Sequence, residues 1–100
     1  MADFYHVTCF PRDGVTPSDI EAVLNKAIDW YRLRYGLWIL YSSTNAEKWT
    51  IRLRPLVEDG GTLLISRMDM SSYDGFTSVK VFHWINAHLS RGASSRPDPG

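Results

Sequence analysis

Two short stretches of the sequence are rich in aromatic and β-branched residues. Residues 4–10 read FYHVTCF, and residues 37–41 read LWILY. Such content predicts β-strands. Because successive side chains of a strand point to opposite faces of a sheet, we expect both faces of this sheet to be apolar. A layer of helices covers one face, so the second face needs a cover of its own.

The cover of the second face constrains how the chain associates. The terminal segment, another subunit or a ligand could supply it. A chain of 100 residues also buries only about 60% of its surface on folding, and 13% of these residues are aromatic. We therefore predict a homodimer.

Two helix starts are visible in the sequence. The first has a hydroxyl N-cap at Thr16, then Pro17, and an acid three residues after the cap. An apolar stripe at helical spacing follows, formed by Ile20, Val23, Leu24, Ala27, Ile28 and Tyr31. The second start is a capping-box pattern at Thr44 and Glu47, and Pro55 should stop or kink its helix. The stripe of this second helix is formed by Ala46, Trp49, Leu53 and Leu56.

Residues 30–41 allow two interpretations. They could prolong the first helix as far as Gly36, or they could form two strands joined by a turn at Tyr35 and Gly36. The aromatic and branched content of residues 37–41 favours a strand there.

The remaining segments complete the predicted order of elements. Residues 62–68 predict a strand, and residues from Ser78 onward predict a terminal helix, although residues 77–81 could instead be a short strand. Residues 90–100 hold almost nothing apolar and predict a disordered tail. The order predicts one ferredoxin-like α+β domain over residues 1–89: a two-layer sandwich with an antiparallel sheet, two helices on one face and a C-terminal helical segment.

Composition narrows the classes of protein. Eleven basic and eleven acidic residues give a formal net charge of zero, which weakens the case for an unaided nucleic-acid binder. An apolar content of 44% excludes a disordered chain. Cys9 is the only cysteine, which suits a reducing compartment. The sequence shows no membrane span, signal peptide or cofactor motif, so we expect a cytoplasmic protein without membrane contact or cofactor.

Candidate catalytic groups are few. Cys9 would need a nearby base to act as a nucleophile, but His6 points to the opposite face of the same strand, so a buried structural cysteine is favoured. Asp13, Asp69 and Asp74 could hold a metal ion, but their spacing does not distinguish them from ordinary loop acids. Asp13 and Asp69 remain the candidate catalytic residues, and no metal site is predicted.

Three arginines are the candidate nucleic-acid-binding residues. In the two-strand interpretation Arg32 and Arg34 share one strand face, and Arg67 lies on another strand. If they share a surface with Trp or Tyr rings, they could hold phosphates while the rings stack on bases. The simpler interpretation is a solvated rim of arginines paired with acids.

Several motifs resemble a known family. They are Asp29-Trp30, Trp38-Ile39-Leu40, Asn45-Ala46-Glu47, Arg52-Leu53-Arg54-Pro55-Leu56, Leu63-Leu64-Ile65 and His83-Trp84-Ile85. In these motifs, and over roughly residues 4–89, the chain resembles the small bacterial SinR-family proteins. These are related to the smaller subunit of the CRISPR spacer-acquisition complex and to VapD-like ribonucleases. The resemblance implies a ferredoxin-like fold and a dimer.

One departure from that family bears on function. Nuclease-active relatives carry an aspartate at the end of the first strand, where it holds a divalent metal, and the matching position here is at or near Cys9. A thiol is a poor ligand for magnesium. We therefore predict a dimeric interaction protein that binds protein or nucleic acid without catalysis. The alternative is a magnesium-dependent nuclease that uses Asp13 or Asp69, and a small-molecule-binding domain is a third interpretation.

Overall fold

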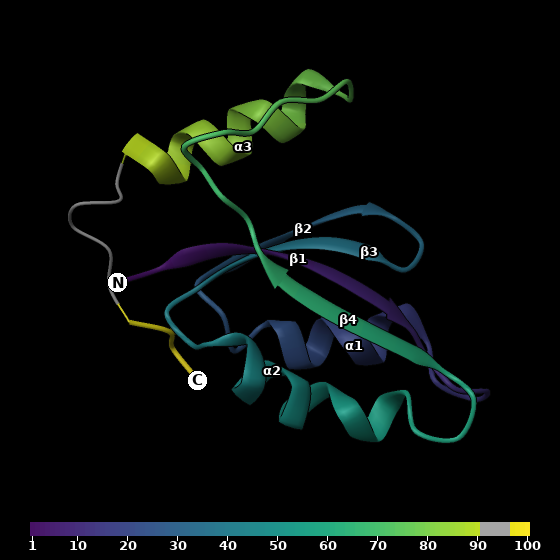
Figure 1. Cartoon of the computed structure of the whole chain (residues 1–100). Helices are drawn as coiled ribbons and strands as arrows, with labels where there is room; N and C mark the ends of the chain where they lie inside the picture. Colours follow the sequence, from purple (N-terminus) through teal and green to yellow (C-terminus); the bar gives the residue numbers. More distant parts are fainter. Residues whose placement is uncertain (91–96) are drawn as a thin grey trace.

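A computed structural model describes residues 1–90 and 97–100, and the chain forms an α+β domain there (Figure 1). Across these residues it contains four strands, three α-helices and one 3₁₀ turn. In chain order they are β1 (Asp3–Phe10), α1 (Pro17–Leu24), β2 (Asp29–Arg34), β3 (Leu37–Ser42), α2 (Ala46–Leu53), the 3₁₀ turn (Arg54–Leu56), β4 (Thr62–Arg67) and α3 (Val79–Ser90). The predicted α+β class is confirmed.

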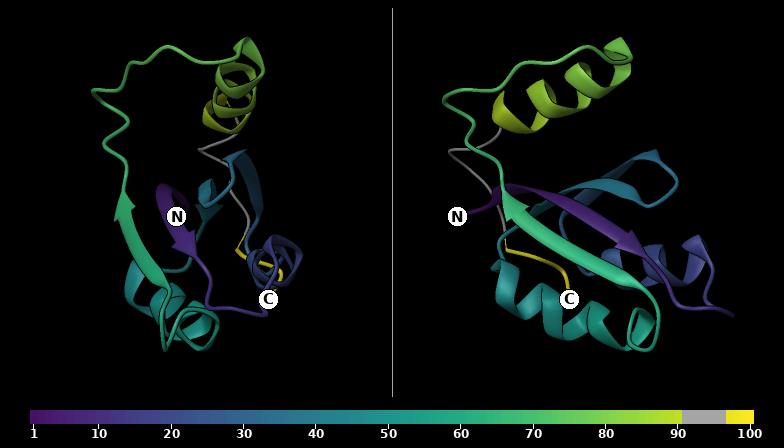
Figure 2. Two further views of the ribbon diagram at one scale, coloured as in Figure 1. Left: turned by 90° about the vertical axis from the view of Figure 1, so that its right-hand side faces the viewer. Right: turned by 45° about the vertical axis from the view of Figure 1, so that its right-hand side comes forward.

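The four strands form one sheet in the order β2-β3-β1-β4, and each neighbouring pair is antiparallel. Helices α1 and α2 lie on one side of this sheet, while α3 lies on the other side (Figures 1 and 2). The sheet with α1 and α2 is compatible with the predicted two-layer sandwich. We call the side toward α1 and α2 the closed face, and the side toward α3 the groove face.

The first helix begins as the sequence indicates but ends earlier. The Thr16 hydroxyl accepts a hydrogen bond from the Asp19 amide, and the Asp19 carboxylate accepts one from the Thr16 amide. The helix ends at Leu24, so the predicted extension of its stripe to Tyr31 is wrong. The chain turns after Leu24 and enters β2, which pairs with β3. Because of this pairing, Ile28 and Tyr31 pack on the groove face.

The two-strand interpretation of residues 30–41 is confirmed. Strands β2 and β3 form a hairpin whose turn contains Tyr35 and Gly36. Gly36 has φ = 83°, and a Cβ at this position would overlap the Phe10 ring, so the turn depends on glycine. The sequence also allowed a short strand over residues 77–81. This strand does not form, and α3 begins at Val79 instead.

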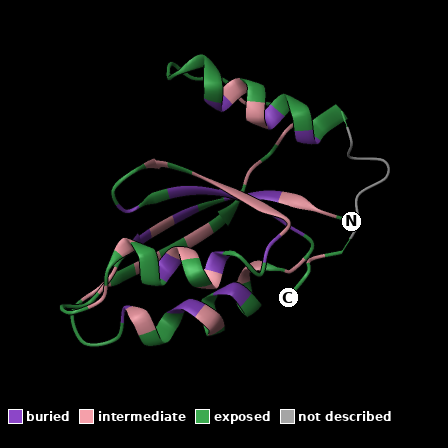
Figure 3. Ribbon diagram, turned by 180° about the vertical axis from the view of Figure 1, so that it is seen from behind, coloured by how far each residue is buried: buried purple, intermediate pink, exposed green. Residues whose placement is uncertain are grey.

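The closed face carries the larger core (Figure 3). Side chains of β1 and β3 alternate as predicted: Tyr5, Val7 and Cys9 lie in this core, together with Trp38 and Leu40. Helices α1 and α2 contribute the buried residues Ile20, Leu24, Trp49 and Leu53. A smaller core on the groove face joins the sheet to α3 through Phe4, Ile39, Tyr41, Val81 and Ile85.

The groove face is covered unevenly. Strand pairing places Phe4 beside Tyr41, His6 beside Ile39 and Ser66, and Thr8 between Leu37 and Leu64. The first of these rows is buried under α3. In the last row Leu64 is 68% exposed and Leu37 is 36% exposed. The terminal helix therefore covers one end of the second apolar face and leaves the other end in solvent.

The C-terminal residues were predicted to form a disordered tail over residues 90–100. Ser90 is the last residue of α3, and residues 91–96 lie outside the described residues. Asp98 and Gly100 make hydrogen bonds to the domain. In the part of the chain that the structure describes, no helix is long and apolar enough to cross a membrane.

Candidate functional site

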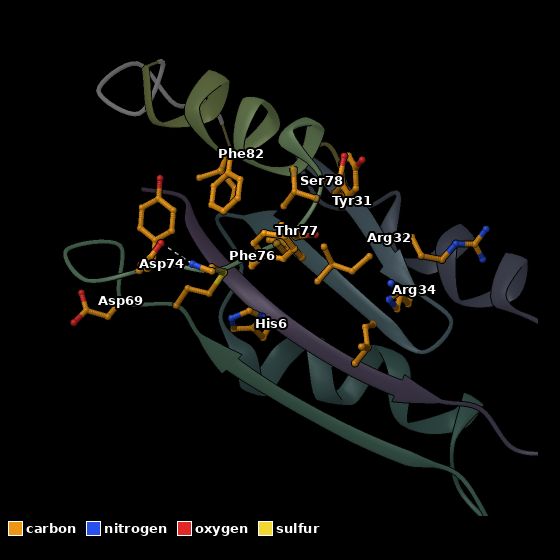
Figure 4. Close-up of a pocket in the computed structure, with 18 of the residues that line it drawn as sticks. His6, Tyr31, Arg32, Arg34, Asp69, Asp74, Phe76, Thr77, Ser78 and Phe82 are labelled. Atoms are coloured by element: carbon orange, nitrogen blue, oxygen red, sulfur yellow. Dashed lines mark hydrogen bonds between the residues drawn. The ribbon is translucent and has the colours of Figure 1, made fainter.

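A groove of about 1170 Å³ lies between α3 and the uncovered part of the sheet (Figure 4). His6 and Ile39 lie along its sheet side, and Val81 and Ile85 of α3 lie along the helix side. The loop of residues 68–78 borders it between β4 and α3. Apolar and polar side chains line this groove in similar measure, and a concave site with converging polar groups is a candidate binding site.

The loop beside the groove presents one aromatic ring completely to solvent. Phe76 is fully exposed, and its neighbours in the loop are mostly exposed as well. The carboxylate of Asp69 accepts hydrogen bonds from the Ser71 hydroxyl at 2.6 Å and the Ser71 amide at 3.0 Å. These hydrogen bonds lower the pKa of Asp69 below its usual value. Asp69 therefore shapes the start of the loop.

The far end of α3 is held to the sheet by a partly buried polar contact. The Trp84 indole N–H donates to Asp29 Oδ2 at 2.8 Å, and His88 Nε2 lies 2.8 Å from the same oxygen. The His88 ring also stacks on Tyr41, with ring centroids 4.4 Å apart. A buried ring that keeps a hydrogen-bond partner avoids a desolvation penalty. This contact fixes the helix that forms one wall of the groove.

The three candidate arginines border the groove but do not form one surface. A register irregularity separates Arg32 from Arg34, so Arg32 lies opposite Trp38 on the closed face and Arg34 lies opposite Leu37 on the groove face. The expectation that they share a strand face is therefore wrong. Their side chains diverge in Figure 4, where Arg32 points toward α1.

The surroundings of Arg32 and Arg67 also separate the three arginines. The Arg32 guanidinium lies 3.3 Å from the Glu21 carboxylate of α1. Arg67 lies opposite Tyr5, on the closed face, at the other edge of the sheet. Three strand spacings separate β2 from β4, or about 14 Å. The strands therefore do not bring the three arginines together to bind one phosphate backbone.

The candidate acids are also far apart. Asp13 follows the end of β1 that pairs with Thr62, whereas Asp69 follows the opposite end of β4. A strand of this length separates them by roughly 20 Å. Asp74 lies in the same loop as Asp69 and borders the groove with it. Within residues 1–90 and 97–100 there is no group of three or more His, Cys, Asp or Glu side chains that could hold a metal.

Cys9 is a buried thiol, as expected. It is fully enclosed in the closed-face core, and burial raises its pKa to about 11. A thiol with such a pKa is protonated at neutral pH and is a poor nucleophile. His6 is exposed on the opposite face, where it borders the groove.

Sequence reasoning missed the residues that shape this site most directly. Asp29 contacts Trp84 and His88 across 55 and 59 positions of the chain, a separation that periodicity cannot bridge. Phe76 and Tyr73 are the two aromatic residues of a Ser-, Asp- and Gly-rich loop, and the sequence does not distinguish the exposed Phe76 from Tyr73, which packs against the groove-face core. Comparisons with protein-family models, curated proteins and solved structures found no match.

Proposed function

We propose that this protein is a non-catalytic interaction module that forms a homodimer through its groove face. The observation that carries the proposal is the fully exposed Phe76 ring beside a groove large enough to receive one. In a symmetric dimer the same surface acts in both copies, so the Phe76 of each copy would enter the groove of the other.

The surface around the groove supports a second copy as the occupant. Leu37, Leu64 and Phe10 are exposed on the same side of the sheet. Burying one Phe side chain stabilises an association by about 1.5–3 kcal/mol, and a symmetric dimer buries two. Arg34 and Asp74 both border the groove, so opposite charges can meet when two identical surfaces face each other. A formal net charge of zero means that two copies do not repel each other strongly.

A protein surface fits this groove better than nucleic acid does. Asp69 and Asp74 border it together with Arg34 and Arg67, so it does not offer phosphates a uniformly positive surface. Arg32 is already paired with Glu21. The nuclease alternative lacks a specific observation in its favour, since Asp13 and Asp69 lie at opposite ends of β4.

The proposed fold is ferredoxin-like. Its support is the order β-α-β-β-α-β of the first six elements, together with the strand order β2-β3-β1-β4. Membership of the SinR-like family is likewise a proposal, which rests on the sequence motifs quoted above. The proposed compartment is the cytoplasm, because the single cysteine is a free thiol.

Sedimentation of the full chain tests the proposed dimer. We expect a species of twice 11.4 kDa at tens of micromolar protein, and a monomer for Phe76→Asp, because a charge in the groove of the partner would be desolvated. Ile51→Asp is the matched control, since Ile51 is 71% exposed on α2, across the sheet from the groove. A monomeric parent chain, or an equal loss of dimer in both variants, would contradict the proposal.

Two further measurements on the same preparation address catalysis and nucleic acid. We expect no cleavage of labelled RNA or double-stranded DNA with magnesium or manganese, and no salt-sensitive binding to single-stranded RNA. Cleavage that disappears in Asp13→Ala or Asp69→Ala would establish the nuclease alternative. Salt-sensitive binding that weakens in Arg34→Ala would instead establish a nucleic-acid-binding groove.

A further inference from the structure

The last described residues of the chain dock on the junction between β3 and α2. Asp98 Oδ2 accepts hydrogen bonds from the Ser42 and Thr44 hydroxyls, both at 2.6 Å. Asp98 Oδ1 accepts a third, from the Ser43 amide at 2.8 Å. We call Ser42, Ser43 and Thr44 the carboxylate cradle. It lies between β3 and α2. The C-terminal residues that meet it lie beside α2, on the side of the sheet away from α3 (Figures 1 and 2).

The cradle is built into the closed-face core. Ser42 is fully buried, and its hydroxyl oxygen accepts hydrogen bonds from the Trp49 indole N–H at 2.8 Å and from the Thr44 amide at 3.0 Å. A hydroxyl has two acceptor sites and one donor. With both acceptor sites in use, Ser42 offers its proton, and Asp98 Oδ2 is much nearer to it than the Thr44 carbonyl, which is 3.5 Å away.

This arrangement selects an acceptor, and in particular a charged one. Three donors converge on two carboxylate oxygens, whereas an amide would turn its own N–H group toward one of them. Burial raises the pKa of Asp98, but the hydrogen bonds from Ser42, Thr44 and Ser43 outweigh it and lower that pKa below its usual value. The cradle therefore stabilises the ionised carboxylate.

Main-chain contacts add a preference for a peptide over a free carboxylate ion. The Asp98 amide donates to the Ser43 hydroxyl at 2.8 Å. Two residues later, the Gly100 amide donates to the carbonyl of Lys26, which lies two residues after the end of α1, at 3.2 Å. These two hydrogen bonds are donated by backbone amides, one of Asp98 itself and one of a residue that follows it. A small carboxylate such as acetate offers none of them.

We propose that the carboxylate cradle is a recognition site for an aspartate residue within a peptide, and that Asp98 is its built-in occupant. A second aspartate-containing peptide reaches the cradle when Asp98 leaves it. The site is separate from the groove, because Ser42 and Trp49 belong to the opposite side of the sheet. Its function therefore does not depend on the proposed dimer.

A titration of the full chain tests this site. The probe is N-acetyl-Pro-Asp-Pro-Gly-amide, which reproduces residues 97–100, and the readouts are the Ser43 and Thr44 amide signals and the Trp49 indole signal in NMR spectra. In Asp98→Ala we expect these signals to shift and saturate with the peptide. In the parent chain we expect at least about tenfold weaker binding, because a tethered ligand competes at millimolar effective concentration.

Three comparisons decide between the outcomes. Asp13→Ala, which removes an exposed carboxyl elsewhere, should behave as the parent chain does. The matching peptide with asparagine in place of aspartate, and sodium acetate, should each shift the Asp98→Ala signals much less than the aspartate peptide. An equal response to the asparagine peptide would overturn carboxylate recognition, and an equal response to acetate would overturn peptide recognition.

The variant must remain folded for the titration to count. Asp98→Asn keeps the shape of the side chain and loses its charge, so it replaces Asp98→Ala if the latter loses its dispersed amide spectrum. Absence of any shift at Ser43, Thr44 and Trp49 in a folded variant would refute the proposal.

Discussion

The two faces of the sheet carry similar side chains but are covered to different extents. On the closed face, Trp38 and Leu40 are completely buried beneath α1 and α2. On the groove face, α3 buries Phe4 and Tyr41 but leaves Leu64 largely exposed. Apolar composition therefore does not decide which residues form the core. The number and placement of the helices that cover each face decide it.

The difference in helix cover also indicates which face stabilises the domain and which face is available for association. Contacts on the closed face come from two helices that each connect two strands of the sheet. The groove face depends on one helix that follows a long loop and is held by Asp29 at one end. Regions with few buried contacts open more easily than the core. We expect the groove face to be the part of the domain that adapts to a partner.

Truncating a leucine on each face should show the largest difference. Leu40→Ala removes a fully buried side chain from β3, and we expect it to lower the free energy of unfolding by about 2–5 kcal/mol. Leu64→Ala, the matched change on β4 of the groove face, should change it by less than about 0.5 kcal/mol. Urea unfolding of dilute protein measures both values. Similar losses in the two variants would show that a second chain covers the groove face even at low concentration.

Removing the anchor of α3 should have the next largest effect. Asp29→Ala leaves the buried His88 ring and the Trp84 indole without their shared acceptor, which costs about 1–3 kcal/mol. Because this contact joins α3 to the sheet, we expect faster hydrogen exchange at the α3 amides and little change at the β1 and β3 amides. Asp13→Ala is the control. Unchanged protection of α3 would mean that the apolar contacts of Val81 and Ile85 hold the helix unaided.

The smallest effect that we predict concerns pH. The folded pKa of Asp98 lies below its unfolded value because hydrogen bonds from the cradle outweigh the effect of burial. Its contribution to stability is therefore fully present above the unfolded pKa, which is about 3.9 for aspartate. It is lost as pH falls through the folded pKa, because the unfolded chain takes up the proton first.

Comparison with Asp98→Ala isolates this contribution. The difference in free energy of unfolding between the parent chain and the variant should be constant above about pH 5 and should shrink at lower pH. Urea unfolding at several pH values measures it. A difference that grows as pH falls would contradict the hydrogen-bonded carboxylate.

Local sequence patterns identified most of the secondary structure. The N-cap at Thr16 marked the start of α1, and the content of residues 37–41 marked β3, because both signals act within a few residues. The end of α1 was misjudged, since the helical stripe continues by coincidence into Ile28 and Tyr31. These two side chains pack on the groove face because β2 pairs with β3, a contact that the local spacing does not contain.

The candidate sites were much less predictable. The sequence correctly separated Cys9 from His6, since alternation along one strand is a local rule. It could not show that a register irregularity divides Arg32 from Arg34, or that Asp13 and Asp69 lie at opposite ends of β4. The docking of Asp98 at Ser42 spans 56 positions and also escaped it.

An α+β domain whose sheet is apolar on both faces follows from local patterns in the chain, because side-chain alternation and helix capping are properties of neighbouring residues. How far each face is covered, and which distant polar groups meet, follow from the folded arrangement. Both outcomes depend on where α3 and the C-terminal residues pack against the sheet, because packing brings together side chains that are far apart in the sequence.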